Sequence, residues 1–368
     1  MGKLKAFFKR KDIIFSGKRY GIDAMGAMAQ GLFCTLLVGT ILNTLGQQFN
    51  IGFLNATIAT IGKGEGATTY TIGGLASAMV GPGIAIAIGY ALHCPPLVLF
   101  SLIPVGFATN AMGGAGGPLA VYVVAIVASE CGKLVSKETK IDILVTPIVT
   151  VLVGIGLASL VAEPIGTAAS AVGDAVKWAT QQQPLLMGML VSVIIGIALT
   201  LPISSAAICA ALNLTGLAGG AAVAGCCAQM VGFAVMSYRE NRLGGLVAQG
   251  VGTSMLQMPN IIKNPRIWIP PILTSAITGP LATCLFKMEM NGSAVSSGMG
   301  TCGFVGQIGV YTGWLNDIAS GSKASITTFD WIGLILICFV LPAILTWIFG
   351  KILRKIGWIK ENDLKLDL

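Results

Sequence analysis

The chain has 368 residues, of which 54% are hydrophobic and only 10% are charged, whereas about 25% of the residues in ordinary globular domains are charged. A water-soluble fold of this size could not cover its surface with so few charges, so the composition excludes that class. The net charge of +8 does not indicate nucleic-acid binding, because the basic residues form short clusters beside apolar runs instead of one stripe.

Apolar runs of membrane-helix length follow one another along the chain. A helix needs about 20 mostly apolar residues to cross the hydrocarbon layer, and the runs at residues 141–161 and 331–349 come close to that length. Further runs lie at residues 21–46, 71–92, 96–112, 118–134, 185–201, 217–236, 270–285 and 299–311. The sequence therefore predicts an all-α membrane protein with about ten membrane-embedded helices, including broken or re-entrant segments.

Basic residues gather at the chain ends and between apolar runs. They are Lys3, Lys5, Lys9, Arg10, Lys11, Lys18, Arg19, Lys133, Lys137, Lys140, Arg239, Arg242, Lys263, Arg266, Lys351, Arg354, Lys355, Lys360 and Lys365. The positive-inside rule places these groups and both termini in the cytoplasm of a bacterial cell. We expect a basic cytoplasmic tail at residues 1–19, a polytopic membrane domain at 20–350 and a second cytoplasmic tail at 351–368. Residues 163–183 and 316–330 then form external loops.

Three segments are too polar or too rich in Gly and Pro for a regular lipid-facing helix. They are residues 50–70, the stretch Leu-Pro-Ile-Ser-Ser-Ala-Ala from Leu201, and residues 291–307. Irregular backbone at membrane depth is tolerated only inside protein or beside a wet cavity, and in transporters such segments mark substrate sites. Ordinary loops outside the membrane are the alternative. The glycine-rich run 113–118 predicts either a sharp turn or another broken helix.

Glu65 is the strongest functional candidate, because it lies between glycines in the first broken segment. A carboxylate there can accept hydrogen bonds from hydroxyl groups of a solute or exchange a proton. His93 lies between two apolar runs. Its role there could be that of a gate, a proton-responsive donor or a plain helix cap. Hydroxyl and amide side chains of the broken segments and their neighbours complete the expected polar lining. They are Ser204, Ser205, Asn213, Thr301 and Gln307.

The other amides in or beside apolar runs, namely Gln229, Gln249, Gln257 and Asn260, either recognise a solute or join helices. Nine cysteines show no metal-like spacing with the single histidine, and we interpret them as packing residues. We expect no metal, no cofactor and no catalytic residue.

The stretch at residues 298–307 (Gly-Met-Gly-Thr-Cys-Gly-Phe-Val-Gly-Gln), together with residues 201–206 and Ile269-Pro-Pro, resembles the membrane IIC components of the phosphotransferase system. The branch that it resembles is the PfoR-like group, and the resemblance extends over residues 21–350. It implies a homodimeric sugar permease with re-entrant hairpins and an alternating-access transport domain. Separate IIA and IIB subunits would carry the phosphoryl group, and a hairpin glutamate with a nearby histidine would contact the sugar. Glu65 and His93 are the counterparts by residue type.

Two other functions remain open at this point. One is a membrane-embedded sensor or regulator that retains a transporter fold. The other is a proton-coupled carrier for organic anions, in which helix N-termini hold a carboxylate and Glu65 or His93 takes the proton.

Overall fold

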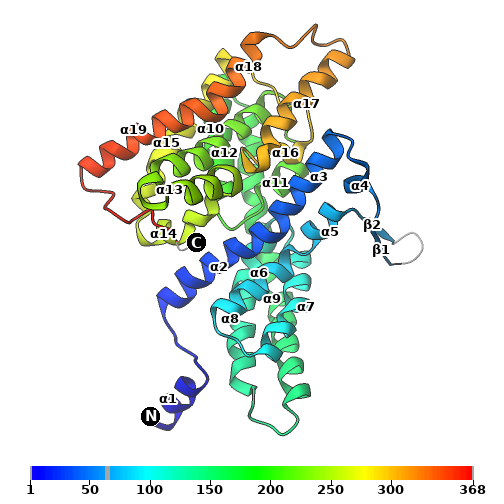
Figure 1. Ribbon diagram of the computed structural model, residues 1–368, viewed down its shortest axis with the longest axis vertical. Coiled ribbons are helices and arrows are strands. Elements are labelled where there is room, and N and C mark those ends of the chain that lie inside the picture. Colours follow the sequence, from blue (N-terminus) through cyan, green and yellow to red (C-terminus); the bar gives the residue numbers. More distant parts are fainter. Residues whose placement is uncertain (1, 63–66, 367–368) are drawn as a thin grey trace. The chain divides into compact units, whose positions relative to one another are not determined.

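The computed structural model describes residues 2–62 and 67–366, and most of them are helical (Figure 1). The chain divides into two compact units: unit 1 comprises Met1–Gly39 and Gly74–Ala169, and unit 2 comprises Thr40–Gly73 and Ser170–Leu368. The boundaries fall within three helices, α3 (Val38–Gln48), α5 (Ile72–Ala78) and α9 (Asp142–Thr180).

Unit 1 consists of helices that approach closely at glycines. Its remaining elements are α1 (Gly2–Arg10), η1 (Arg19–Asp23), α2 (Ala24–Leu32), η2 (Phe33–Leu37), α6 (Val80–Ala91), α7 (Pro96–Gly113), η4 (Gly114–Gly116) and α8 (Gly117–Val135). Helices α2 and α6 meet where a Cβ atom on Gly31 would lie 2.8 Å from the carbonyl carbon of Gly83. Helices α6 and α7 meet in the same way at Gly81 and Gly106. Small residues let membrane helices pack backbone against backbone, which explains the high glycine content.

Helices α7 and α8 form an antiparallel hairpin. The chain reverses at Gly114, whose φ of +50° lies in the left-handed region that glycine adopts without strain. Val98 near the start of α7 then packs against Gly132 near the end of α8. Of the two alternatives predicted for residues 113–118, a sharp turn or another broken helix, the structure has the sharp turn.

Helix α9 is longer than the sequence suggests. Its 39 residues correspond to about 58 Å at 1.5 Å per residue, well beyond the hydrocarbon thickness. The region 163–183, expected as a loop, is instead helical as far as Thr180, and Pro164 lies inside the helix. One proline removes a single backbone hydrogen bond, which a long membrane helix tolerates.

Unit 2 is built around α12, whose membrane-length window is 89% buried. Its other elements after residue 180 are α10 (Pro184–Thr200), α11 (Ser205–Ala211), α12 (Gly216–Met236), α13 (Tyr238–Val247), η5 (Ala248–Gly252), η6 (Ser254–Gln257), α14 (Met258–Lys263), η7 (Pro265–Trp268), α15 (Ile269–Pro280), η8 (Leu281–Leu285), α16 (Ala294–Ser297), η9 (Cys302–Phe304), α17 (Val305–Ala319), α18 (Thr328–Ile335), η10 (Leu336–Val340) and α19 (Leu341–Lys355). Helices α10, α15 and α19 pack around α12, as Figure 1 shows.

The first broken segment, residues 50–70, contains the only strands in the described chain. Helix α4 (Gly52–Asn55) precedes β1 (Ala59–Ile61), which pairs antiparallel with β2 (Thr68–Tyr70). The Asn55 side chain donates a hydrogen bond to the carbonyl of Gly46 at 2.7 Å, which anchors this segment to the end of α3. Residues 63–66, and with them Glu65, lie outside the described residues.

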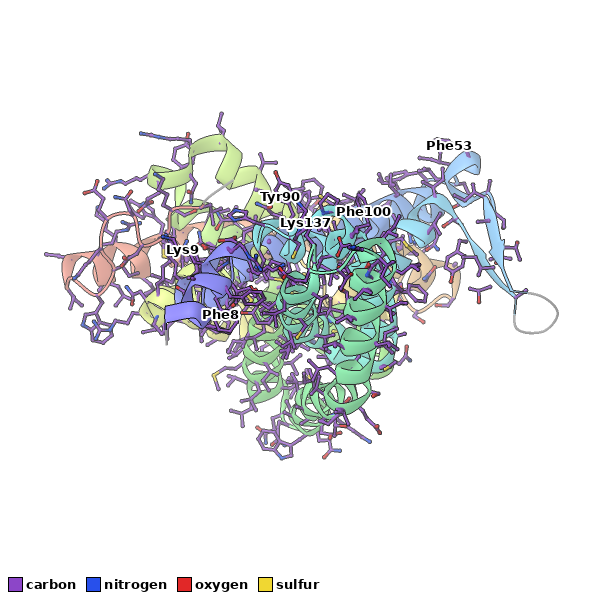
Figure 2. The ribbon with its side chains drawn as sticks, turned by 90° about the horizontal axis from the view of Figure 1, so that it is seen from below. Phe8, Lys9, Phe53, Tyr90, Phe100 and Lys137 are labelled. Carbon is purple, nitrogen blue, oxygen red and sulfur yellow. The ribbon has the colours of Figure 1, made fainter. Side chains whose placement is uncertain are left out.

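Within residues 2–62 and 67–366, six helical stretches are long and apolar enough to cross a membrane, or seven if the bent pair of α5 and α6 forms one span. Many of their apolar side chains face outward: Tyr90 is 76% exposed and Phe100 is 62% exposed (Figure 2), and Leu160 on α9 is 72% exposed. Such surfaces are stable against lipid tails but not against water. The predicted fold class, an all-α membrane protein, is confirmed.

The chain after α19 returns to the surface of unit 2. Ile359 and Leu364 are buried beside Phe233, Met236 and Ile261. Side-chain amides hold the main chain at the same time: Asn241 and Gln257 donate to the carbonyl of Leu364, and Asn260 donates to that of Lys365. Residues 356–366 are therefore packed onto α13 and α14.

Candidate functional site

The second broken segment begins where α10 ends at Thr200. Leu201 is extended and Pro202 cannot continue the helix. The hydroxyl of Ser204 then accepts a hydrogen bond from the backbone N–H of Ala207 at 3.2 Å and so caps α11. The helix break predicted at Pro202 is present, and Ser204 is the N-cap residue of α11.

Helix α11 ends one turn before α12. Asn213 follows its last turn with a left-handed φ of +47° and donates its backbone N–H to the carbonyl of Ala210. Asparagine tolerates this conformation better than most residues. Its side chain is exposed.

The third broken segment folds into two short helical turns, α16 and η9, before α17. Gly300 and Gly303 both have left-handed backbones, with φ of +52° and +50°. A Cβ atom on Gly300 would also lie 2.6 Å from the Cβ atom of Cys226 on α12. Only glycine satisfies both the dihedral angle and the close approach, so this loop is pressed directly against α12.

The chain on either side of α11 and the third broken segment dock on each other through serine hydroxyls that donate to main-chain carbonyls. The Ser205 hydroxyl donates to the carbonyl of Gly298 at 2.8 Å, and the Ser297 hydroxyl donates to the carbonyl of Leu214 at 2.6 Å. Both hydroxyls are buried. Backbone groups that no regular helix satisfies thus find partners across the junction, as backbone inside a membrane requires.

A short antiparallel bridge closes the junction. Gly216 and Met290 exchange two backbone hydrogen bonds of 3.1 and 3.0 Å. The Gly216 N–H also approaches Oδ1 of Asn291 at 3.1 Å. The N-terminus of α12 is therefore fixed to the chain that leads into α16.

Thr301 and Gln307, in the third broken segment, face α12 with poorly satisfied polar groups. Within the described chain, the only partner of the fully buried Thr301 hydroxyl is Sδ of Met230 at 3.6 Å. The Gln307 amide donates to Sγ of Cys227 at 3.2 Å, and no described group bonds its buried Oε1. Sulfur is a weak acceptor. A buried polar atom without a good partner costs about 1–3 kcal/mol, so a hydroxyl-bearing ligand or water would be stabilised here.

Gln229, two turns before the end of α12, has better partners. Its Oε1 accepts from Nε1 of Trp268 at 2.9 Å and from the Thr200 hydroxyl at 3.3 Å. The Thr200 hydroxyl also lies 2.8 Å from that of Ser254. This buried network connects α10, α12, η6 and η7 and leaves Gln229 in a structural position. In the described chain, no group of three or more His, Cys, Asp or Glu side chains could hold a metal ion.

The sequence model of the family described as Phosphotransferase system, EIIC matches residues 22–366. The chain belongs to this family. It is therefore a multi-pass membrane permease of the phosphotransferase system, and the resemblance of residues 201–206 and 298–307 to IIC components is confirmed. A search of curated proteins and a search of solved structures found no match.

In this EIIC chain, His93 lies in unit 1. It follows α6 with a left-handed φ of +56°, and its exposed ring places Nδ1 3.1 Å from Oδ2 of Asp12. Asp12 accepts two further bonds from Arg19, at 2.6 and 3.1 Å. His93 is thus part of a charged cluster at the end of α6, while Glu65, its expected companion, lies outside the described residues.

Sequence reasoning missed the sulfur atoms that face Thr301 and Gln307. Met230 and Cys227 lie one turn apart on α12, 71 and 80 residues from their partners. Their apolar run gives no sign of a polar neighbour. It also missed Asn291 as a joint between broken segments, although the residue stands at the start of the predicted segment.

Proposed function

We propose that this EIIC permease moves a small polyhydroxylated solute, a sugar or a polyol, by alternating access. The observation that carries the proposal is the pair Thr301 and Gln307, whose buried polar groups face sulfur. A sugar hydroxyl both donates and accepts, so it offers these two side chains stronger bonds than Met230 and Cys227 do.

The broken segments supply the movable element in this proposal. The junction contacts are a few hydrogen bonds, of which Ser205 to Gly298 and Ser297 to Leu214 are the shortest. Each contributes about 0.5–1.5 kcal/mol. An arrangement held by a few such bonds opens at a modest free-energy cost, which a bound solute can offset.

The remaining candidates keep their proposed roles. Glu65 would anchor hydroxyl groups, and His93 would donate to the solute. Ser204, Ser205 and Asn213 would complete the polar lining at the two ends of α11. We place the chain in the PfoR-like branch of the family, on the residues quoted above.

The proposal also includes the assembly. The protein would act as a homodimer in the bacterial cytoplasmic membrane, with both termini in the cytoplasm beside separate sugar-phosphorylating IIA and IIB subunits. Cysteine labelling from each side of the membrane tests the topology, since the labels at residues near both ends should be accessible only from the cytoplasmic side.

The test of the site is uptake of a panel of sugars and polyols by Thr301→Val and Gln307→Leu. We expect each variant to raise the half-saturating concentration of the transported solute about tenfold, because each loses one buried hydrogen bond of about 1.4 kcal/mol. Thr278→Val is the matched control: Thr278 is equally buried, but its hydroxyl is satisfied by the carbonyl of Thr274 at 3.0 Å. Wild-type uptake by both site variants would refute the assignment.

Glu65 is tested separately with Glu65→Gln, which keeps the size of the side chain and removes its charge. We expect binding of the identified solute to weaken. If Glu65→Gln binds that solute as well as the wild type, Glu65 is not part of the site.

A further inference from the structure

Unit 2 contains a polar pocket of about 370 Å³, and neither Thr301 nor Gln307 is among the residues that line it. Its volume falls at the lower end of the range for small-molecule sites, about 300–1,000 Å³. Three parts of the chain line it: the stretch before α16, the last two turns of α17 and the connection from α17 to α18. The residues that matter are Lys287, Glu289, Asn291, Trp314, Asp317 and Lys323.

Asn291 fixes the two carboxylates of the pocket. Its Nδ2 donates to Oε2 of Glu289 at 3.1 Å and to both carboxylate oxygens of Asp317 at 3.2 and 3.0 Å. Its Oδ1 receives the N–H of Gly216. All hydrogen-bonding groups of this amide are thus used within the protein, so the amide positions the carboxylates and leaves their remaining lone pairs for a ligand.

The charges that line the pocket do not neutralise one another. Among the described residues, neither Glu289 nor Asp317 forms an ion pair within 4.0 Å, and neither does Lys287. Lys323 is paired, but with Asp330 at 2.8 Å, a residue outside the pocket lining. Unpaired charges of both signs therefore face one cavity.

The backbone holds Lys287 in this position. Its φ is +46°, a left-handed value that is uncommon for a long side chain. Residues in such conformations gather at binding and active sites, where the surrounding structure holds them. On the other side of the pocket, Trp314 is 3% exposed and its ring packs edge-on against Trp331 at 5.4 Å between centroids. The Trp314 side of the pocket is therefore buried and packed, while Lys287 and Glu289 are exposed at its opening.

We propose that this pocket is a second binding site for a small polyhydroxylated solute, and this inference rests on the proposed function. Glu289 and Asp317 accept hydrogen bonds from the hydroxyls of the solute, and Lys287 donates to its oxygens. A simple cation would suit the carboxylates but meet the unpaired ammonium group of Lys287, and an anion would suit Lys287 but meet the two carboxylates. A neutral solute whose hydroxyls donate and accept satisfies both sets of groups.

The position of the pocket links it to the junction of the broken segments. Asn291 contacts the pocket carboxylates through one end of its amide and Gly216, at the start of α12, through the other. A solute in the pocket would therefore contact the carboxylates that Asn291 holds, next to the bond that joins the third broken segment to the start of α12.

The experiment measures solute binding to the full chain in detergent micelles by thermal shift and calorimetry. The polyhydroxylated probes are D-glucose, D-mannitol and D-glucitol, and the contrasting probes are L-alanine and calcium chloride. The variants are Glu289→Gln with Asp317→Asn, and separately Lys287→Asn, which keeps a residue that tolerates the left-handed backbone. Asp174→Asn, an exposed carboxylate elsewhere in unit 2, is the matched control.

We expect at least one polyhydroxylated probe to bind the wild type. The variant Glu289→Gln with Asp317→Asn should weaken that binding about tenfold, because it loses charge-assisted hydrogen bonds to the solute. Asp174→Asn loses no such bond and should leave the binding unchanged. Thr301→Val with Gln307→Leu should keep this binding, which separates the pocket from the proposed transport site. Lys287→Asn should weaken binding even if the carboxylate variant does not fold.

Three results would overturn the inference. One is that no polyhydroxylated probe binds at millimolar concentration. Another is that L-alanine or calcium binds where the sugars do not. The third is that binding disappears in the Thr301 and Gln307 variant but survives in the Glu289 and Asp317 variant, which would leave the proposed function standing without the second site.

Discussion

The ammonium group of Lys133 lies 2.9 Å from a carboxylate oxygen of Glu130, one turn earlier on α8, and both residues are almost completely buried. Lys133 also donates to the carbonyls of Asp12 and Leu92, at 3.0 and 3.1 Å. A cation beside the last carbonyls of α6 is favourable, because they carry partial negative charge. One side chain thus joins α6, α8 and the N-terminal segment of unit 1.

Lys133→Met should destabilise the protein strongly, by about 3–5 kcal/mol, because it leaves the buried Glu130 charge without a partner. The measurement is thermal unfolding of the purified protein. The double variant with Glu130→Gln removes both charges, so we expect it to recover part of the loss. A double variant no more stable than Lys133→Met would show that the lost bonds to Asp12 and Leu92 matter more than the unpaired charge.

Unit 1 should lose stability in acid through Asp12. The hydrogen bonds from the Arg19 guanidinium, supported by His93, lower the pKa of the Asp12 carboxyl from 3.8 to about 2. A lowered folded-state pKa stabilises the fold above the ordinary value, and that contribution is lost as pH falls from about 4 through 2.

The measurement for Asp12 is the unfolding temperature between pH 5 and pH 2, compared with Asp12→Asn. The variant should be less stable than the wild type at neutral pH and should lack this part of the acid-dependent loss. Identical pH profiles for both proteins would contradict the role of the Asp12–Arg19 pair.

Leu364→Ala should release the chain after α19. Leu364 is fully buried beside Phe233 and Ile267, and truncation of a buried leucine costs about 2–5 kcal/mol where the site cannot collapse. We expect faster protease cleavage within residues 356–366. Leu366→Ala is the control, because Leu366 is only partly buried and its contact to Asn241 uses the backbone N–H.

Gly220→Ala should destabilise unit 2, because a Cβ atom there would overlap the carbonyl oxygen of Met288. Overpacking of this kind costs about 1–3 kcal/mol. Gly156→Ala on α9 is the matched change, since its Cβ would meet no atom within 4 Å, and alanine in a helix is more stable than glycine by about 0.5–1 kcal/mol. Opposite shifts in unfolding temperature for the two variants would support the close packing of α12, and a stable Gly220→Ala would contradict it.

Pro202 and the glycines of residues 298–303 predicted the breaks in the helices correctly. Proline restricts its own backbone, and glycine permits left-handed dihedral angles, whatever the surrounding structure is. Helix α9 was different: the distribution of basic residues predicted an external loop at residues 163–183, yet the helix continues through Pro164 to Thr180. Whether a proline ends a helix depends on what satisfies the freed backbone, and that is decided by the neighbouring elements.

By itself, the sequence determined the class of the protein and its family, because the length and apolar character of its runs are set by the bilayer. The tertiary structure alone decided which polar groups are satisfied. The Ser205 hydroxyl bonds to Gly298, 93 residues away, whereas the partners of the Thr301 and Gln307 side chains among the described residues are sulfur atoms. Such pairings depend on which helix faces pack together, and a local pattern of residues does not predict which faces these are.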